Sequence, residues 1–304
     1  MNNDISIAVI GSINLDIVAR VKAFPQPGET ITDAVVNRFP GGKGANQALA
    51  AHRLGASVFM VGRVGNDPVA EEALQTLRAE GINLRYCKPL EGYSTGLALI
   101  VVNEEGENQI VVAPGANSAF DAGHLEFPQT DACIAQLEVP VETILKAARA
   151  NNAFFCLNAA PVKPVPHELL EHVDLLVVNE IEAKALGSEL ESFTGLLAST
   201  FGARGAVLSC KGHQVAKSKP PKVNVVDTTG AGDAFTAALT VALVRGLHPQ
   251  EALDQACVVG ALATTKMGAQ SSPDSKSVQE LTRTIAELKT VMFSDFHILE
   301  EEPE

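Results

Sequence analysis

The alternation of short apolar runs with longer helical patterns is the feature that most restricts the folds open to this chain. Apolar runs with the length of a buried strand occur at 7–10, 58–61, 133–137, 154–157, 175–178 and 206–209. Segments with helical periodicity occupy 44–54, 68–80, 141–151, 234–245, 249–265 and 277–292. This alternation predicts an α/β fold, a three-layer sandwich in which helices cover both faces of a mainly parallel central sheet.

Two stretches interrupt the alternation with hairpin signals. Residues 97–102 and 109–113 flank a polar Glu-Glu-Gly-Glu turn, and 16–21 with 30–39 resembles a second antiparallel pair. Hairpins inserted into an α/β pattern suggest a small β-sheet that acts as a lid. We therefore expect a single domain over 1–304, with a lid of about 15–39 and 94–114 inserted in it.

Composition excludes several classes of partner. Asp and Glu total 36 against 23 Lys and Arg, a net charge of −13, and no basic run occurs, which disfavours a nucleic-acid partner. No apolar run reaches the ~18 residues of a membrane span, and no Lys or Arg precedes the apolar segment 5–10 as in a secretory signal. Five cysteines without a C-x-x-C motif suit reduced thiols, so we expect a soluble, cytoplasmic protein.

The densest chemical signal is the segment 227–235, Asp-Thr-Thr-Gly-Ala-Gly-Asp-Ala-Phe, which opens an apolar helix. Gly230, Ala231 and Gly232 at a strand-to-helix turn can aim backbone N–H groups at an anion, and the helix N-terminus adds positive potential. Asp233 has two interpretations. It is either a structural N-cap of the helix or a general base that deprotonates a hydroxyl attacking the phosphate held there.

A second polar group lies near the N-terminus. Asn14 and Asp16 are two residues apart on an extended segment and so share a face. Lys43 and Asn46 are three apart at a helix start, after Gly42. A carboxylate, an ammonium and two amides suit a polyhydroxy ligand, although local turns and a solvated lysine would also account for these residues.

Polar residues also follow two buried strands. Glu138 comes after 132–137, and Asn179 comes after 174–178 with Glu182 three residues later. Ligands of parallel sheets bind outside the carboxyl ends of the strands, so these side chains should share an edge with Asn14 and the Gly230 loop. The alternatives are a turn residue before Pro140 for Glu138, and a helix-capping pair for Asn179 and Glu182. Walker and dinucleotide-binding glycine motifs are missing, which disfavours P-loop ATPases and dehydrogenases.

From about residue 7 to 272 the chain resembles the ribokinase family of sugar and nucleoside kinases. Both family signatures are present in order, Gly-Gly-Lys-Gly-Ala-Asn-Gln at 41–47 and the segment 227–235. The Lys-Gly pair in the first signature is typical of the ribose-specific members. The resemblance therefore implies ATP-dependent phosphorylation of D-ribose at its 5-hydroxyl.

The resemblance also implies roles for individual residues. Asp233 would be the general base, and Gly230, Ala231 and Gly232 would stabilise charge on the transferring phosphoryl group. The sugar would be held by Asn14, Asp16, Gly42, Lys43, Asn46, Glu138 and Asp233. Mg²⁺ would be held through Asn179 and Glu182, and an activating K⁺ through Asp227, Thr229, Ala263, Lys266, Gly268 and Ser272, several by backbone carbonyls.

The ATP site has two candidate loops. The family loop follows a strand, so we place it at Ser209–Gly212, after the predicted strand 206–209, rather than at 200–205 (Thr-Phe-Gly-Ala-Arg-Gly). The nucleotide would then contact Asn179, Ser209, Gly212, Gly232 and Cys257.

Other functions remain open. The acceptor could be another alcohol, such as deoxyribose, fructose or a nucleoside such as adenosine. A catalytically silent sugar- or nucleotide-binding regulator is the alternative from a different class. The resemblance also implies a homodimer joined through the lid.

Overall fold

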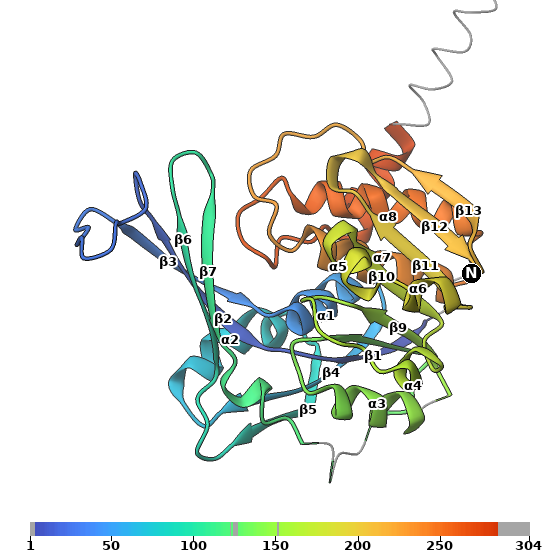
Figure 1. The fold of residues 1–304 in the computed structure, drawn as a ribbon, viewed down its shortest axis with the longest axis horizontal. Coiled ribbons are helices and arrows are strands. Elements are labelled where there is room, and N and C mark those ends of the chain that lie inside the picture. Colours follow the sequence, from blue (N-terminus) through green and yellow to red (C-terminus); the bar gives the residue numbers. More distant parts are fainter. Residues whose placement is uncertain (1–3, 122, 124–126, 151, 285–304) are drawn as a thin grey trace, which may run out of the picture.

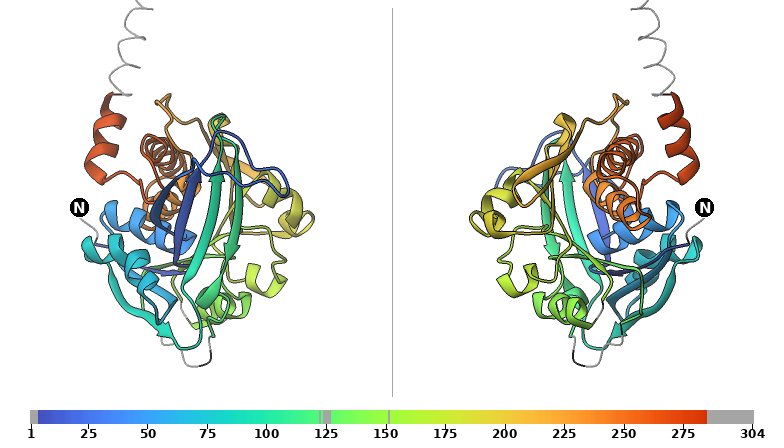
Figure 2. Two further views of the ribbon diagram at one scale, coloured as in Figure 1. Left: turned by 90° about the vertical axis from the view of Figure 1, so that its left-hand side faces the viewer. Right: turned by 90° about the vertical axis from the view of Figure 1, so that its right-hand side faces the viewer.

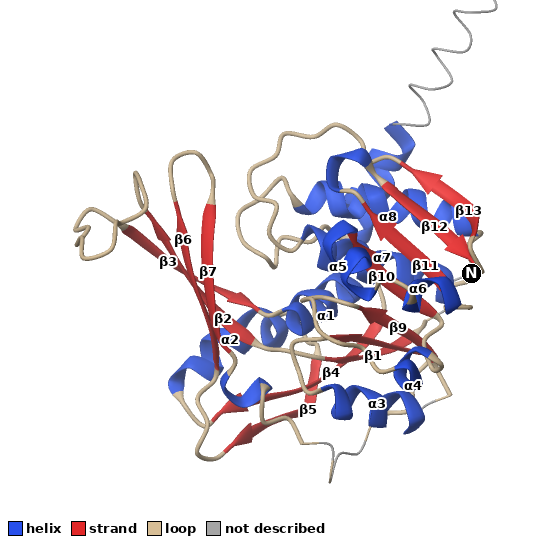
Figure 3. Ribbon diagram, in the orientation of Figure 1, coloured by secondary structure: helices blue, strands red, loops and turns tan. Residues whose placement is uncertain are grey.

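A nine-stranded sheet forms the middle layer of the protein (Figures 1 and 3). The computed structural model describes residues 4–121, 123, 127–150 and 152–284. In spatial order the strands are β13 (His213–Ser218), β12 (Ala206–Cys210), β11 (Leu196–Thr200), β10 (Leu175–Asn179), β9 (Phe154–Asn158), β8 (Ala132–Gln136), β1 (Ser6–Ile10), β4 (Ser57–Gly65) and β5 (Asn83–Leu90).

The sheet is parallel from β11 to β5, and only β12 and β13 run antiparallel to their neighbours. From β1 the chain builds outward through β4 to β5, then returns to β8 on the other side of β1. Such a reversal leaves a crevice at the carboxyl ends of the strands, where ligands of open α/β sheets bind.

Helices cover both faces of this sheet. One face packs against α1 (Lys43–Arg53), α2 (Pro68–Ala79), α7 (Ala231–Val244) and α8 (Pro249–Ala263). The other packs against α3 (Val141–Ala150), α4 (His167–Leu170), α5 (Glu180–Leu186) and α6 (Glu189–Ser192). Strand β1 shows the division, because Ile7 and Val9 join the first core cluster while Ala8 and Ile10 join the second. The expected three-layer α/β fold is confirmed.

A separate four-stranded sheet stands beside the main one (Figures 1 and 2). It contains β3 (Val35–Gly41), β2 (Asn14–Arg20), β6 (Gly96–Val102) and β7 (Asn108–Ala113), in that order. The two expected hairpin pairs, β2 with β3 and β6 with β7, are antiparallel as predicted. Parallel pairing of β2 with β6 joins them into one sheet. Strand β3 begins at residue 35 instead of 30. We call this four-stranded sheet the lid sheet.

The sequence analysis missed three strands of the main sheet, β5, β11 and β13. It also expected a strand to lead into the turn at Gly230, whereas residues 219–230 contain no strand. The expected helices α1, α2, α3, α7 and α8 begin and end within three residues of the prediction. The last expected helix, 277–292, is described only as far as residue 284, where 275–284 is helical. Its remainder and residue 151 lie outside the described residues. Over the described part of the chain, no helix has the length and apolar character needed to span a membrane.

Candidate active site

The start of helix α7 has the geometry of an anion site. Gly230 is its N-cap, in the left-handed region with φ 78°, and supplies no side-chain cap. A Cβ on Gly230 would lie 2.2 Å from the carbonyl oxygen of Ala269, so only glycine fits there. The N–H of Ala231 donates a hydrogen bond to the backbone carbonyl oxygen of Thr228 at 3.3 Å. The N–H groups of Gly232 and Asp233 follow in the same first turn, where helical N–H groups lack intrahelical acceptors and attract anions.

Asp233 is the third residue of α7 and not its N-cap, which contradicts the structural interpretation of this residue. Its side chain is buried, with 6% of the residue exposed. The Oδ1 atom accepts a hydrogen bond from Nε2 of Gln47 at 2.9 Å, and Oδ2 accepts one from Nδ2 of Asn46 at 2.9 Å. The carboxylate therefore joins the start of α7 to the first turn of α1.

Helix α1 begins against the connection between β1 and β2. Its N-cap is Gly42, with φ 90°, and a Cβ there would lie 2.8 Å from both Ser12 O and Asn14 N. Oε2 of Glu138 accepts hydrogen bonds from the Lys43 N–H at 3.2 Å and from the Ser12 hydroxyl. Glu138 lies in the turn before Pro140, as its structural alternative expected, and its side chain also links the end of β8 to the start of α1.

Asn14 is oriented by Asn117, a residue that the sequence analysis did not single out. Nδ2 of Asn117 donates to Oδ1 of Asn14 at 2.8 Å, and the same side chain bonds both backbone groups of Ile13. Because its oxygen is engaged in this way, Asn14 has its amide donor left for a ligand.

The site concentrates buried charge. Burial, together with the nearby carboxylates of Glu138 and Asp233, raises the pKa of Asp16 to about 7, and Lys43 opposes this rise. The pKa of Lys43 is raised mainly by Asp233, and Glu138, Glu182 and Asp16 add to this effect against the cost of burial. Lys43 therefore stays an ammonium among four carboxyl groups.

Asn179 and Glu182 form the capping box that was the structural alternative for this pair. The Asn179 side chain accepts from the N–H groups of Ile181 and Glu182, and Glu182 accepts from the Asn179 N–H at 2.8 Å. Glu182 is buried, which raises the pKa of its carboxyl group. Because both Glu182 oxygens bond Asn179, this pair fits Mg²⁺ through water better than by direct ligation.

The placement of the nucleotide loop at Ser209–Gly212 is wrong, because it depended on missing β11. Strand β12 runs antiparallel, so its end at Cys210 pairs with Leu196, the first residue of β11. Gly212 therefore lies at the edge of the sheet opposite the site. The loop 200–205 follows β11 directly, and Thr200 pairs with Asn179 at the correct edge.

Cys257 lies on α8 in the core, where burial raises the pKa of its thiol to about 11 and Ser218 hydrogen-bonds it. A pocket of about 570 Å³ lies near the chain that follows β13. It is lined by Lys222, Val223, Asn224, Val226 and Thr265.

The segments expected to hold K⁺ meet in the structure. Asp227 accepts from the Thr229 N–H and hydroxyl through Oδ1 and from the Gly268 N–H at 2.9 Å through Oδ2. The Ser271 hydroxyl donates to the carbonyl of Ala263 at 2.7 Å. All the atoms expected to ligate K⁺ are carboxylate, hydroxyl or carbonyl oxygens, which are the ligands that suit a hard cation. The described residues contain no group of three or more His, Cys, Asp or Glu side chains placed to hold a metal.

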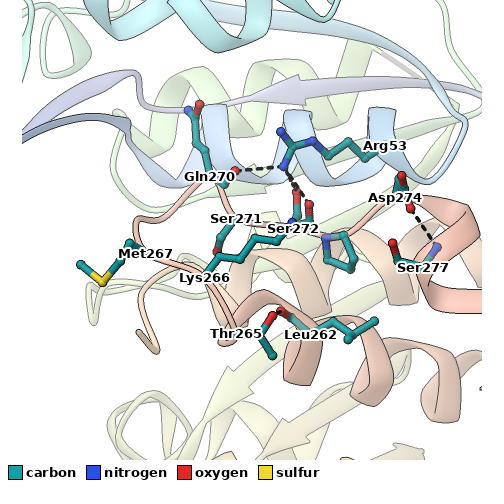
Figure 4. Close-up of a pocket in the computed structure, with 11 residues that line it drawn as sticks. Arg53, Leu262, Thr265, Lys266, Met267, Gln270, Ser271, Ser272, Asp274 and Ser277 are labelled. Carbon is teal, nitrogen blue, oxygen red and sulfur yellow. Dashed lines mark hydrogen bonds between the residues drawn. The ribbon is translucent and has the colours of Figure 1, made fainter. Parts of the chain in front are cut away.

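Arg53 holds the far side of the expected cation loop (Figure 4). Its guanidinium donates to the carbonyls of Gln270 at 2.9 Å and Ser272 at 2.7 Å, and pairs with Glu80. A pocket of about 440 Å³ is lined by Arg53, Gln270 and Ser272 together with Lys266 and Ser271. The last residue of α1 thus fixes the loop that packs against Gly230.

Sequence reasoning missed several buried polar residues of the site. Gln47, Gln136 and Asn158 are joined in one hydrogen-bonded group beside Asp233. The available signal was positional, because Gln136 and Asn158 are polar residues at the carboxyl ends of apolar strands.

A buried carboxylate beside a glycine-capped helix N-terminus, a set of buried polar side chains suited to a polyhydroxy ligand, and a separate lid sheet are together typical of a kinase that acts on small hydroxylated molecules. The chain belongs to the pfkB family of carbohydrate kinases, whose family model matches residues 4–276. The expected resemblance is thereby confirmed, and the protein is a carbohydrate kinase.

Individual relatives cover nearly the whole chain. A ribokinase from Bacillus subtilis is 39% identical over 291 residues, covering 91% of this chain and 99% of the relative. The crystal structure of a ribokinase from Thermotoga maritima superposes with a TM-score of 0.84 at 32% identity, covering 92% of this chain and 99% of that one. The ribokinase from Arabidopsis thaliana, solved with ribose and ATP, gives a TM-score of 0.82 at 29% identity and covers 91% and 98%.

Proposed function

We propose that this protein phosphorylates D-ribose at its 5-hydroxyl with ATP. The observation that carries this proposal is the position of Asp233, one buried carboxylate held between the anion site of α7 and the first turn of α1. The ribokinase relatives, and the ribose and ATP bound in the Arabidopsis structure, support the choice of substrates.

The sugar would be held by the buried polar set at the start of β2 and α1. Asn14 would donate a hydrogen bond through its amide. The Oδ1 atom of Asn46, which has no partner among the described residues, would accept a hydrogen bond from a sugar hydroxyl. Asp16, Gly42, Lys43 and Glu138 complete the set.

In the chemical step, Asp233 takes the proton of the 5-hydroxyl as that oxygen forms a bond to the γ-phosphorus. The bond between the γ-phosphorus and the β–γ bridging oxygen breaks, and ADP leaves with that electron pair. The amides of Gly230 and Gly232, and that of Ala231 once it gives up its bond to the Thr228 carbonyl, would stabilise the charge on the transferring group. A closed lid would exclude water and so prevent ATP hydrolysis.

ATP would lie across the carboxyl edge near Asn179 and Gly232, with the loop 200–205 in the place first given to Ser209 and Gly212. Cys257 would line the adenine side of the nucleotide.

Cations would act at two places. Mg²⁺, bound with ATP through Glu182 and Asn179 by way of water, would neutralise phosphate charge. K⁺ would take oxygen ligands from Asp227, Thr229, Ala263, Lys266, Gly268 and Ser272. With K⁺ bound, these residues would hold the Ala269 carbonyl in contact with Gly230 and so preserve the geometry of the anion site.

We also propose one kinase domain over 1–304, a lid of about 15–39 and 94–114, and a cytoplasmic location suited to five cysteines without a paired motif. A homodimer through the lid is supported by its apolar surface. Side chains of Val35, Val36, Leu99, Ile110, Val111 and Val112 are between 47% and 66% exposed. Leu99 and Val111 are paired in the ladder between β6 and β7, and exposed apolar residues grouped on one sheet mark an interaction surface.

An acceptor screen tests the proposed function. Purified protein, ATP, Mg²⁺ and K⁺ are incubated with ribose, deoxyribose, fructose or adenosine, and ADP formation is measured alongside the sugar phosphate. We expect the highest kcat/KM with ribose. A higher value with another acceptor would reassign the substrate, and binding of sugar without product from any acceptor would favour a silent regulator.

A further inference from the structure

A group of buried amide side chains surrounds the carboxylate of Asp233. Gln47, on α1, is fully buried, and so is Gln136, the last residue of β8. Nε2 of Gln47 donates both to Oδ1 of Asp233 at 2.9 Å and to Oδ1 of Asn158 at 3.1 Å. Oε1 of Gln47 accepts from Nε2 of Gln136 at 2.7 Å. Both polar atoms of the Gln47 amide therefore form hydrogen bonds, and one of these bonds is the contact with Asp233.

The surrounding elements hold this amide in one orientation. An ionised carboxylate only accepts hydrogen bonds, so the nitrogen of Gln47 must face Asp233 and its oxygen must face Gln136. Gln136 and Asn158 end adjacent parallel strands, and Asn158 in turn donates to the carbonyl of Val177 on β10. Three strands thus fix the position of the single donor that contacts Oδ1.

The two oxygens of Asp233 differ as a result. The donor on Oδ1 cannot turn away without breaking bonds to Gln136 and Asn158. The donor on Oδ2 belongs to Asn46, whose own Oδ1 has no hydrogen-bond partner within the described part of the chain, so no further bond of this amide holds the donor against Oδ2. Oδ2 is therefore the oxygen that a substrate hydroxyl can approach.

We propose that Gln47 is a positioning residue for catalysis, which holds Oδ1 of Asp233 so that Oδ2 faces the acceptor hydroxyl. This rests on the proposed role of Asp233 as the base. Gln47 acts only through Asp233 and contacts no substrate. Its effect is to fix the rotation of the carboxylate, because a misdirected base oxygen slows proton transfer even when the substrates bind normally.

The test compares Gln47→Met with Gln136→Met. Methionine has nearly the length of glutamine and no hydrogen-bond donor. Both substitutions break the bond between Gln47 and Gln136, but only the first removes the contact with Asp233. Thermal melting measures the structural cost of each, calorimetry measures the Kd for ribose and for ATP, and steady-state kinetics gives kcat.

We expect Gln47→Met to lower kcat by about 10–10²-fold while both Kd values stay within about threefold. Gln136→Met should lower the melting temperature to a similar degree but lower kcat by less than Gln47→Met does, because Gln47 then keeps its bonds to Asp233 and Asn158. An unchanged kcat in Gln47→Met would overturn the proposal, as would equal losses of kcat in the two variants.

If Gln47→Met does not fold, Gln47→Glu keeps the shape of the side chain and the acceptor for Gln136. We expect a loss of kcat at least as large, because a carboxyl oxygen then replaces the donor on Oδ1. A kcat like that of the wild type would overturn the proposal. The proposed function fails separately, if the wild-type protein forms no sugar phosphate or if Asp233→Asn retains full turnover.

Discussion

Gly230 and Gly232 stand two residues apart at the start of α7 and meet different surroundings. A Cβ on Gly230 would collide with the Ala269 carbonyl at 2.2 Å, whereas a Cβ on Gly232 has no other atom within 4 Å. The first glycine is therefore needed for the fold of the turn. The second leaves open the space in which a phosphate would lie.

We predict that Gly232→Leu folds and loses activity. Leucine is a good helix former, so melting should occur at the wild-type temperature or above it. Its side chain would fill the space in which the phosphate would lie and so keep the phosphate from the amides, and kcat should fall by about 10²–10³-fold, as it does when an oxyanion donor is out of reach. Gly230→Ala is the matched control and should lower the melting temperature, because alanine is strained at φ 78°. ATP kinetics unchanged in Gly232→Leu would contradict the anion site.

A second prediction concerns Asp16 and pH. Its carboxyl group titrates near 3.8 when unfolded and near 7 when folded. Between these values the folded protein retains a proton that the unfolded chain has released, so this group makes stability fall as the pH rises from about 4 to 7. Asp16→Asn should flatten the decline, measured as the melting temperature between pH 5.5 and 8. An identical pH dependence in both proteins would exclude the raised pKa.

At the scale of elements, the sequence predicted the strands and helices with strong patterns. Residues 7–10 lie in a strand that is buried on both faces, and 234–244 lie in a helix that is apolar on nearly all sides, so both segments had strong sequence patterns. Strand β11, with the sequence Leu-Leu-Ala-Ser-Thr, is short, half-buried and polar at its end, and it gave no comparable signal. Its omission reversed the direction inferred for β12, and this error moved the nucleotide loop to the wrong edge.

Local spacing also predicted part of the site. It paired Asn14 with Asp16 and Lys43 with Asn46, because strand and helix periods fix which residues share a face. The contacts of Asn117, Gln136 and Asn158 depend on how elements distant in the sequence pack together. Local periodicity in a single sequence does not predict that packing.

The corrected nucleotide loop can be tested with two matched glycines. Gly202 and Gly212 both have positive φ and open space around the position of a Cβ. Aspartate tolerates this backbone conformation and adds a negative charge. Gly202→Asp should raise the KM for ATP by about tenfold or more through repulsion of the triphosphate, whereas Gly212→Asp should leave it unchanged. The reverse result would restore the original placement.

At the scale of the whole molecule, the net charge of −13 gives no long-range attraction for ATP. Recognition of the triphosphate would then be local, from helix and loop amides assisted by cations. The acidity that argued against nucleic-acid binding is thus compatible with binding one polyphosphate at a backbone site.

The apolar surface of the lid sheet predicts a dimer. Val111 is 66% exposed at the centre of edge strand β7. Light scattering of the wild-type protein should give twice the monomer mass, and Val111→Lys should shift the mass toward one chain, because a charge is costly to bury in an apolar interface. Ile181→Lys, at a residue 72% exposed on α5, is the control and should not change the mass. A monomeric wild type would contradict the dimer.

The central claim is that Asp233 is the base of one sugar-phosphorylating site, and Asp233→Asn tests it most directly. Turnover with ribose and ATP should fall by about 10²–10⁴-fold while the Kd for ribose, measured by calorimetry, changes little. Turnover near that of the wild type, with ribose bound normally, would contradict the account.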